Sequence, residues 1–321
     1  MDFLLSDVHD DLASTVDALL TKADIPARAR AWTHGDHHPV AEVVTALAET
    51  GITGLLIDES SGGSSAGATE MVVAMEQVGR HALPGPIVET VAVLPVLLRS
   101  AGVSGSHLSA LAEGALATCA IPPIAPLAHI AETSYVVIDG VLSTATTTDR
   151  VATVDPTRIL AELGPDEVLA ENVDVHDAAD IGTLATAAQL LGMASAMLAS
   201  AADYAQARKQ FGRAIGSFQA VKHHLADVAI AVEMARPLVY AAALGVDGLV
   251  PEGTDVRRDV AAAKVAAGDA AYLASRRALQ VLGAIGYTTE HDLSLYLTKT
   301  RALLTAWGTP ADLRRRVLES L

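Results

Sequence analysis

The chain has 321 residues, of which 51% are hydrophobic and only 3% aromatic, so it can bury a large core and is not a disordered chain. It carries 22 Lys and Arg against 38 Asp and Glu, a formal net charge of −16 that argues against duplex nucleic-acid binding. Its single cysteine, Cys119, excludes an internal disulfide framework and a cysteine-rich zinc module. The acidic N-terminal segment lacks the basic and long apolar regions of a signal peptide, so we expect a cytoplasmic protein.

The charge is unevenly distributed along the chain. Residues 1–200 hold 7 Lys and Arg against 26 Asp and Glu, and residues 201–321 hold 15 against 12, so the net charges are −19 and +3. A site for a phosphate-bearing small molecule would therefore find its cations in the last third of the chain. An acidic, solvated N-terminal surface is the alternative interpretation of the same numbers.

Residues 1–112 are predicted to form an N-terminal helical domain. Val40, Val43, Val44 and Leu47 recur at helical spacing. The Ser- and Gly-rich segment 59–67 predicts a loop, the sequence ALPGP at 82–86 ends a helix, and an apolar helix is expected over 87–101.

Residues 113–175 are predicted to form a small β domain. Pro122, Pro123 and Pro126 lie too close together for a helix interior. Two β-branched runs then meet at Asp139-Gly140, a pair typical of a tight hairpin turn. The segment VATVD at 151–155 is expected to be a third strand.

Residues 176–321 are predicted to form a C-terminal bundle of four helices. The run 181–202 has no charged residue, yet it is dominated by alanine and interrupted by Gly, Ser and Thr, so we expect a central soluble helix rather than a membrane span. Phe218, Val221, Leu225, Val228 and Val232 form an amphipathic stripe, and further helices fit 256–283 and 290–304. The predicted fold class is mostly α with a small β domain.

Four residues near the N-terminus, His34, Asp36, His37 and His38, suggest a metal site at first sight. Adjacent histidines splay apart in most backbones, and the segment is a predicted loop ending at Pro39. We therefore predict no metal site.

Two long motifs resemble the signatures of the acyl-CoA dehydrogenases. YAQARKQFGRAIGSFQAVKHHLAD at 204–227 contains an Arg, Gln-Phe-Gly, Ile-Gly and Phe-Gln in the family's order. QVLGAIGYTTEHDLSLYLTKTRAL at 280–303 is similar to the second signature, and Gly-Thr at 308–309 falls where the family has Glu-Gly-Thr. The segments GITGLLIDESSGGSSAG and HALPGP also resemble the family, and so does the order helical, β, helical bundle. The resemblance covers nearly the whole chain.

The resemblance implies α,β-desaturation of an acyl thioester with hydride transfer to FAD. Arg208 has the fork geometry that a diphosphate needs, Phe211 can pack beside the adenosine portion, and the glutamines offer amide groups. In the family these groups reach FAD held mainly by a neighbouring subunit, which implies an oligomer. The residues expected to contact the cofactor are Arg208, Phe211, Gln219, Gln280, Gly283, Ala284 (a Gly in the family) and Thr309.

The chain departs from the family at the catalytic base. The family's glutamate stands directly before Gly-Thr, where this chain has Trp307, whose indole cannot accept a proton. The alternative family position, at the start of the first bundle helix, aligns to about Gly182. Asp177 and Asp180 are the nearest carboxylates that could substitute. The family's flavin-side segment should lie near 117–126, where this chain has ATCAIPPIAP.

The chain lacks the family's base but keeps the residues expected to contact the cofactor. In this combination it resembles the smaller subunit of two-subunit acyl-CoA dehydrogenases, such as those that degrade steroid side chains. In such a hetero-oligomer, of the heterotetrameric kind, the larger partner supplies the glutamate and FAD lies at the mixed interface. Two alternatives stay open: a catalytically inert paralogue that binds and stabilises a partner, and a flavin-dependent homodimer of other chemistry, such as oxygenation.

Overall fold

The computed structural model describes residues 5–103, 105–121 and 124–320. The first of its helical regions comprises short helices packed around a common core. They are α1 (Asp7–Lys22), α2 (Ile25–Thr33), α3 (His38–Glu49), η1 (Glu59–Ser61), α4 (Ala68–Arg80), η2 (Glu89–Val93), α5 (Leu94–Ser100) and α6 (Ser106–Ala112).

The helix expected over 87–101 is present but irregular. Its first turns, η2, form a π-helix, and Pro95 lies in the first turn of α5 that follows. A π segment carries one residue more per turn than an α-helix, and such insertions are frequent at functional sites. Here it contains Glu89, a carboxylate that is only 2% exposed.

The β region forms one five-stranded sheet in the order β1-β3-β4-β5-β2. Its strands are β1 (Ala117–Ala120), β2 (Ile124–Pro126), β3 (Thr133–Ile138), β4 (Val141–Val151) and β5 (Leu160–Ala170), of which only β1 and β3 pair in parallel. The predicted hairpin is confirmed: β3 and β4 pair antiparallel across Asp139-Gly140, both with positive φ (49° and 77°).

The prediction of a third strand at 151–155 is wrong. β4 ends at Val151, and the next strand begins only at Leu160. Asp155 instead organises a turn, because its Oδ1 accepts hydrogen bonds from the backbone N–H and the hydroxyl of Thr157. Pro122 and Pro123, on which the proline argument partly rested, lie outside the described residues.

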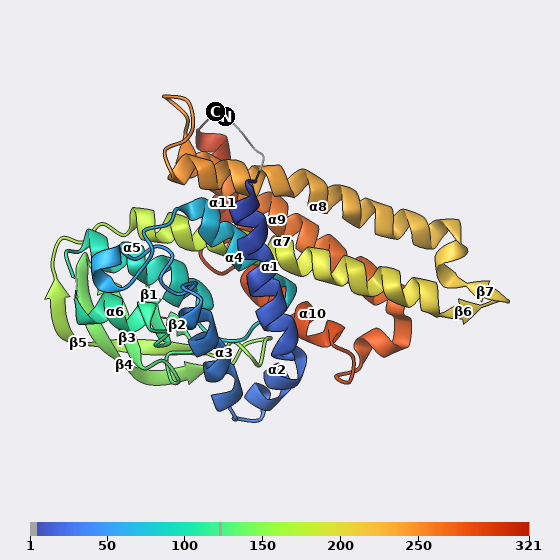
Figure 1. Cartoon of the computed structure of the whole chain (residues 1–321), viewed down its shortest axis with the longest axis horizontal. Helices are drawn as coiled ribbons and strands as arrows, with labels where there is room; N and C mark the ends of the chain where they lie inside the picture. The colour runs from blue at the N-terminus through green and yellow to red at the C-terminus, as the bar shows by residue number, and fades with distance from the viewer. Residues whose placement is uncertain (1–4, 104, 122–123, 321) are drawn as a thin grey trace.

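Three long helices, α7 (His176–Ala207), α8 (Gln219–Val246) and α9 (Val256–Leu282), run side by side in the C-terminal region (Figure 1). A hairpin of β6 (Lys209–Gln210) and β7 (Arg213–Ala214), followed by η3 (Ile215–Ser217), joins α7 to α8. The chain then continues through η4 (Gly283–Tyr287) to α10 (Leu293–Leu303) and α11 (Pro310–Glu319).

Helix α7 is the central helix of the molecule, as its uncharged sequence predicts. By length and apolar composition both α7 and α8 could cross a membrane, but 83% of the apolar window of α7 is buried within the protein, against 39% for α8. Two glycines let α4 approach α7: a Cβ on Gly192 would lie 1.9 Å from the Glu76 carbonyl oxygen, and one on Gly79 would lie 2.1 Å from that of Gln189.

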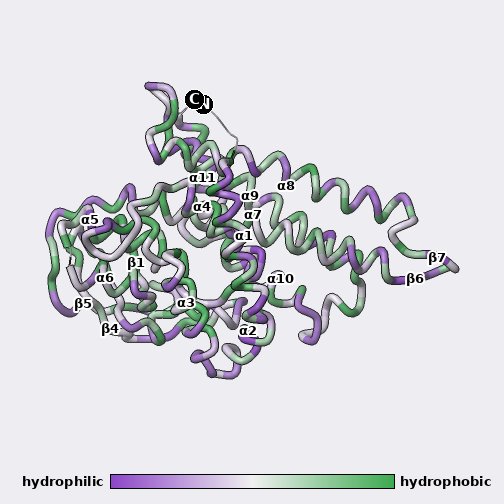
Figure 2. Tube along the Cα trace, in the orientation of Figure 1, coloured by the Kyte–Doolittle hydropathy of each residue, from purple (hydrophilic) through white to green (hydrophobic). Residues whose placement is uncertain are grey.

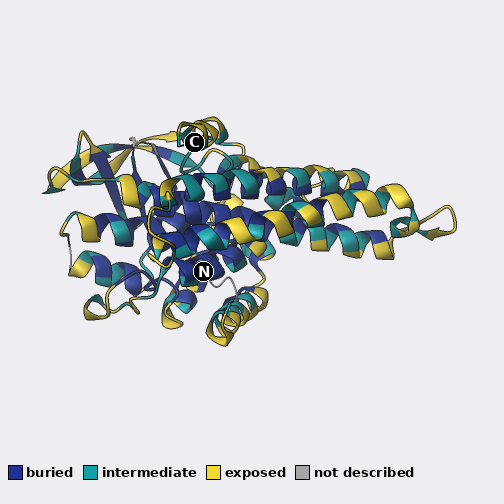
Figure 3. Ribbon diagram, turned by 90° about the horizontal axis from the view of Figure 1, so that it is seen from above, coloured by how far each residue is buried: buried dark blue, intermediate teal, exposed yellow. Residues whose placement is uncertain are grey.

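The chain therefore has a mostly helical fold with a small sheet, arranged as an N-terminal helical region, a middle sheet and a C-terminal helical array. Hydrophobic segments converge where the array meets the N-terminal helices and the sheet (Figure 2). The far part of the long helices is more exposed (Figure 3).

Candidate active site

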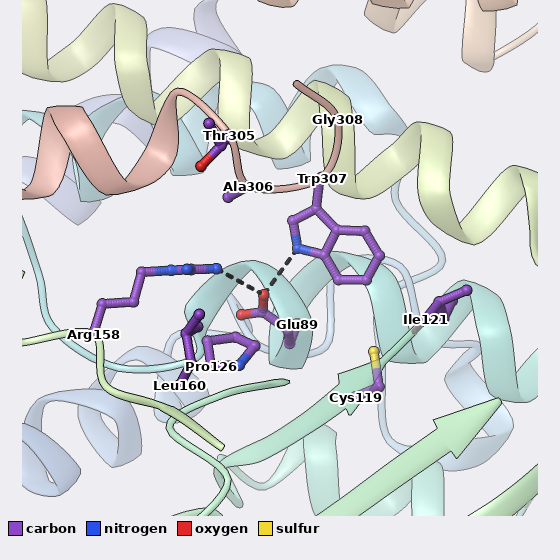
Figure 4. Close-up of a pocket in the computed structure, with 10 residues that line it drawn as sticks. All are labelled: Glu89, Cys119, Ile121, Pro126, Arg158, Leu160, Thr305, Ala306, Trp307 and Gly308. Carbon is purple, nitrogen blue, oxygen red and sulfur yellow. Dashed lines mark hydrogen bonds and ion pairs between the residues drawn. The ribbon is translucent and has the colours of Figure 1, made fainter. Parts of the chain in front are cut away.

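A pocket of about 290 Å³ lies between the sheet and the segment that joins α10 to α11 (Figure 4). Its walls come from η2, from the strands and from the connecting segment. The lining residues are Glu89, Cys119, Ile121, Pro126, Arg158, Leu160, Thr305, Ala306, Trp307 and Gly308. Both burial and the charge of Glu89 hold the pKa of the Cys119 thiol well above its usual value, so this thiol stays protonated.

Glu89 is the carboxylate of this pocket. Its Oε1 accepts a hydrogen bond of 2.8 Å from the indole Nε1 of Trp307 and lies 3.8 Å from a guanidinium nitrogen of Arg158 (Figure 4). The Arg158 side chain is 14% exposed. The buried Glu89 carboxylate thus has a hydrogen-bond donor and a cation beside it, as a buried carboxylate requires.

The two positions at which the resemblance expects a base are in direct contact. A Cβ on Gly182 would lie 2.7 Å from Cδ2 and 3.0 Å from Cε3 of Trp307. Distances below 3 Å leave no space for a side chain at position 182, so the indole occupies that space. Trp307 and Gly182 therefore mark one place in the fold, 125 positions apart in the chain.

The backbone around Trp307 is fixed by partly buried hydrogen bonds. The Thr183 hydroxyl donates to the Trp307 carbonyl oxygen at 2.6 Å, and Lys264 Nζ donates to the carbonyl oxygens of Gly308, at 2.9 Å, and Ala306. Burial, with a smaller contribution from the Arg158 charge, lowers the pKa of Lys264 to about 7. Trp307 itself has a left-handed backbone, with φ of 51°.

Asp177 and Asp180, the carboxylates nearest to Gly182 in the sequence, face away from this pocket. Asp180 is buried and accepts hydrogen bonds from Arg257 Nε at 2.9 Å and Arg316 Nη1 at 2.6 Å. Together with Asp177 it lines a separate cavity beside α8 and α9. Asp180 is thus an ion-pair residue that ties α9 and α11 to α7.

Most of the predicted cofactor contacts lie far from the pocket, at the end of the long helices where the β6–β7 hairpin projects (Figure 1). Arg208 is exposed and directly precedes the hairpin. Phe211, at its tip, is 91% exposed, with its ring edge-on to Phe218 at 6.1 Å. The Arg213 guanidinium stacks on Phe218 at 4.1 Å, so this end presents both cationic and aromatic groups.

The remaining predicted contacts divide between this end and the pocket side. Gln219 begins α8, Gln280 is exposed in the last turn of α9, and Gly283 and Ala284 follow in η4, all at the hairpin end. Thr309 does not join them. It caps the N-terminus of α11 by accepting from the Asp312 N–H, and its hydroxyl donates to the Asp312 carboxylate at 2.6 Å.

Glu89 and Arg158 are the pocket residues that the sequence did not reveal. Glu89 sits in an apolar run that reads as core, and Arg158 in a segment predicted to follow a strand.

Among the histidines of the N-terminal segment, His37 packs edge-on against Trp32 at 4.5 Å between ring centroids. Within the described residues, no group of three or more His, Cys, Asp or Glu is placed to hold a metal ion.

Comparisons with known proteins define the class of this protein. Residues 6–102 match the family model of the acyl-CoA dehydrogenase N-terminal domain, and residues 175–321 match that of the C-terminal domain. The chain belongs to the acyl-CoA dehydrogenase family, whose members are flavin-dependent oxidoreductases.

One curated relative and two solved structures are similar to the chain. The acyl-CoA dehydrogenase IpdE2 of Mycobacterium tuberculosis is 31% identical over 311 residues, covering 95% of each chain. Two solved structures share the fold. A variant of the Tcur3481–Tcur3483 steroid acyl-CoA dehydrogenase has a TM-score of 0.84 at 21% identity, covering 98% of this chain and 97% of the other. The ChsE4–ChsE5 complex from Mycobacterium tuberculosis has a TM-score of 0.81 at 22% identity, covering 100% of this chain and 98% of the other.

FAD, the family's cofactor, fits the two regions differently. The hairpin end offers what an anionic diphosphate and an adenosine need: the exposed guanidinium of Arg208, an exposed phenyl ring and two carboxamides. Gly283, with φ of 61°, has open space around it, so another backbone or ligand can approach closely. The pocket beside Trp307 is at the lower end of the ~300–1,000 Å³ typical of ligand sites.

Proposed function

We propose that this chain is the smaller subunit of a two-subunit, FAD-dependent acyl-CoA dehydrogenase. It contributes cofactor contacts from the hairpin end to FAD at a mixed interface, and a larger partner contributes the catalytic glutamate. The lone chain is inactive. The assembly is a heterotetramer in the cytoplasm and acts on an acyl-CoA thioester, with steroid side-chain thioesters as the substrate class to test first.

The contact between Trp307 and Gly182 is the observation that carries this proposal. α,β-Desaturation needs a carboxylate within hydrogen-bond reach of the proton on the α-carbon. Neither family position offers one, and the indole fills the space between them. The nearby carboxylate, Glu89, is engaged by the indole N–H and faces Arg158.

The hairpin end supplies the part of the chemistry that this chain retains. The chemistry that bound FAD would supply is acceptance of a hydride from the β-carbon of the acyl group. Arg208 would hold its diphosphate by charge-assisted hydrogen bonds, Phe211 would pack on the adenosine portion, and Gln219 and Gln280 would orient polar groups. These are binding and orienting roles, and none of them moves a proton.

Helix α8 provides a face for a partner subunit. Ile230, Met234 and Leu238 recur every four residues on it and are 63%, 69% and 44% exposed. Large apolar side chains at this spacing form a stripe that another helix can cover. Helix α7, although longer and uncharged over 181–202, needs no partner because it is already buried within this chain.

The relatives support a hetero-oligomer and a steroid-type substrate. Two structural neighbours are two-component assemblies, one of them named as a steroid acyl-CoA dehydrogenase. Their identity to this chain is only 21% and 22%, so the partner and the substrate class belong to this proposal and to its test.

Co-expression tests the proposal. The chain is produced alone and together with a larger, glutamate-bearing homologue, and each preparation is assayed for FAD content and for acyl-CoA dehydrogenation with an artificial electron acceptor. We expect turnover and about one FAD per mixed pair only in the co-expressed preparation. The variant Trp307→Glu of the lone chain should stay inactive, because the segment 117–126 lacks the family's flavin-side pattern and a misplaced acceptor removes most of the rate.

The alternatives give different results in the same assay. A yellow, homodimeric lone chain with absorbance near 450 nm would favour a flavin enzyme of other chemistry. Absence of flavin under both conditions would favour an inert, partner-stabilising paralogue. Dehydrogenation by the lone chain would refute the two-subunit role, and Glu89, rather than Asp177 or Asp180, would then be the first residue to replace.

A further inference from the structure

The indole of Trp307 stands where the resemblance places the catalytic carboxylate, next to Gly182, the second expected base position. The family's two base positions serve one reaction, and here they converge on a single point, since a Cβ added to Gly182 would lie 2.7 Å from Cδ2 of the indole. A base reaches its proton only at hydrogen-bond distance, about 2.6–3.2 Å between heavy atoms, so the acyl group must pass beside this point. In this chain the indole already fills it.

Two residues hold the indole, one against its ring atoms and one at its N–H edge. Gly182 leaves a flat surface on α7 for the ring, and Glu89 accepts the N–H at its edge at 2.8 Å. Glu89 is itself buried and comes from the π segment, far from Trp307 in the chain. Rotating the ring out would leave this carboxylate without its indole donor, an unfavourable state for a buried charge.

The backbone cannot easily carry the ring away. The Trp307 carbonyl oxygen accepts from Thr183, and the carbonyl oxygens on either side accept from the buried Lys264. Opening the segment would break these three partly buried bonds together. The geometry therefore describes a fixed side chain rather than a mobile gate.

We propose that Trp307, held by Gly182 and Glu89, closes the acyl pocket of this subunit. This closure does not rest on the proposed function. The proposal also implies a latent pocket: without the indole, this chain should accept a straight acyl chain between α7 and η2.

Binding measurements on the full-length chain test the closure without any turnover. The probe is octanoyl-CoA, titrated calorimetrically into the wild type and into Trp307→Gly, with coenzyme A alone as the ligand control. Glycine suits the positive φ at this position. We expect no saturable binding of octanoyl-CoA by the wild type, at least about tenfold tighter binding by Trp307→Gly, and no change in the response to coenzyme A.

Fluorescence gives a second readout that does not depend on a cavity variant folding. The chain has two tryptophans, so Trp32→Phe leaves Trp307 as the sole emitter. Its emission and its low acrylamide quenching should be unchanged by octanoyl-CoA. The milder variant Trp307→Phe should bind octanoyl-CoA more weakly than Trp307→Gly.

Each other outcome overturns the proposal. Saturable binding of octanoyl-CoA by the wild type, or a shift of the Trp307 emission on its addition, would make the indole a gate. Equal, undetectable binding by wild type and Trp307→Gly would mean that something other than the indole closes the pocket. Failure of the two-subunit function would instead appear as absent turnover in the co-expressed pair, whatever these titrations give.

Discussion

The contact between Gly182 and Trp307 predicts a specific energetic coupling. Replacing Gly182 by Ala in the middle of a helix should by itself stabilise the helix by up to about 1 kcal/mol. In this fold the added Cβ would lie 2.7 Å from the indole and 2.8 Å from Val93 Cγ2. Overpacking of a buried site costs about 1–3 kcal/mol. We therefore expect Gly182→Ala to lower the free energy of unfolding by about 1–2 kcal/mol.

The same substitution should behave differently once the indole is absent. Trp307→Gly alone should be strongly destabilising, by about 3–5 kcal/mol, because it leaves a cavity. In that background both indole contacts of the new Cβ are gone and a Val93 methyl group is its nearest neighbour, so Gly182→Ala should be neutral or mildly stabilising. The difference between the two backgrounds, the coupling energy, is expected at about 1–3 kcal/mol.

Urea unfolding of the wild type, both single variants and the double variant measures this coupling. Gly216→Ala is the matched control: its Cβ would make a tight contact too, at 3.1 Å, but with the Ala205 carbonyl oxygen at the hairpin end. It should be additive with Trp307→Gly. A coupling energy below about 0.5 kcal/mol between Gly182→Ala and Trp307→Gly would refute the seating of the indole on Gly182.

Four further predictions follow from other parts of the molecule. Arg208→Ala should weaken FAD retention of the active assembly by about 1.5–3 kcal/mol without unfolding it, and flavin content that is unchanged after dilution would contradict this. Burial lowers the pKa of Lys264 from 10.5 to about 7, so between these pH values the unfolded chain binds more protons than the folded one. The free energy of unfolding should therefore rise with pH from about 7 to about 10.5. Lys264→Met should remove this contribution, which urea unfolding midpoints measured against pH would reveal. Gly192→Ala should prevent close packing of α4 on α7 and lower the melting temperature far more than Gly216→Ala, and similar melting temperatures would count against that packing. The lone chain should sediment as a dimer or larger, and a monomer stable at micromolar concentration would show that the α8 stripe needs no partner.

Local patterns in the sequence predicted the fold class and much of its organisation. Alanine-rich and amphipathic runs indicated the long helices, which the structure places at 176–207, 219–246 and 256–282. The Asp139-Gly140 pair predicted the hairpin, because few residue pairs adopt two successive positive φ angles. The motifs at 204–227 and 280–303 pointed to the family, which the comparisons confirm. The prediction of a strand at 151–155 was wrong because a short β-branched run is equally typical of the end of a strand and of the turn that follows it.

The site depended on contacts that no local pattern encodes. Glu89 was missed because a single carboxylate in an apolar run gives no periodic signal. Asp180 was considered as a base because the sequence does not show that Arg257 and Arg316, both remote in the chain, pair with it. The resemblance in the sequence predicted that Trp307 and about Gly182 stand at the two family base positions, neither of which is then a carboxylate. Only the tertiary structure showed that these two residues touch and that Glu89 receives the indole N–H. The physical reason is that side-chain type and spacing govern helices and turns over a few residues, whereas the closure of a pocket depends on how distant segments pack against one another.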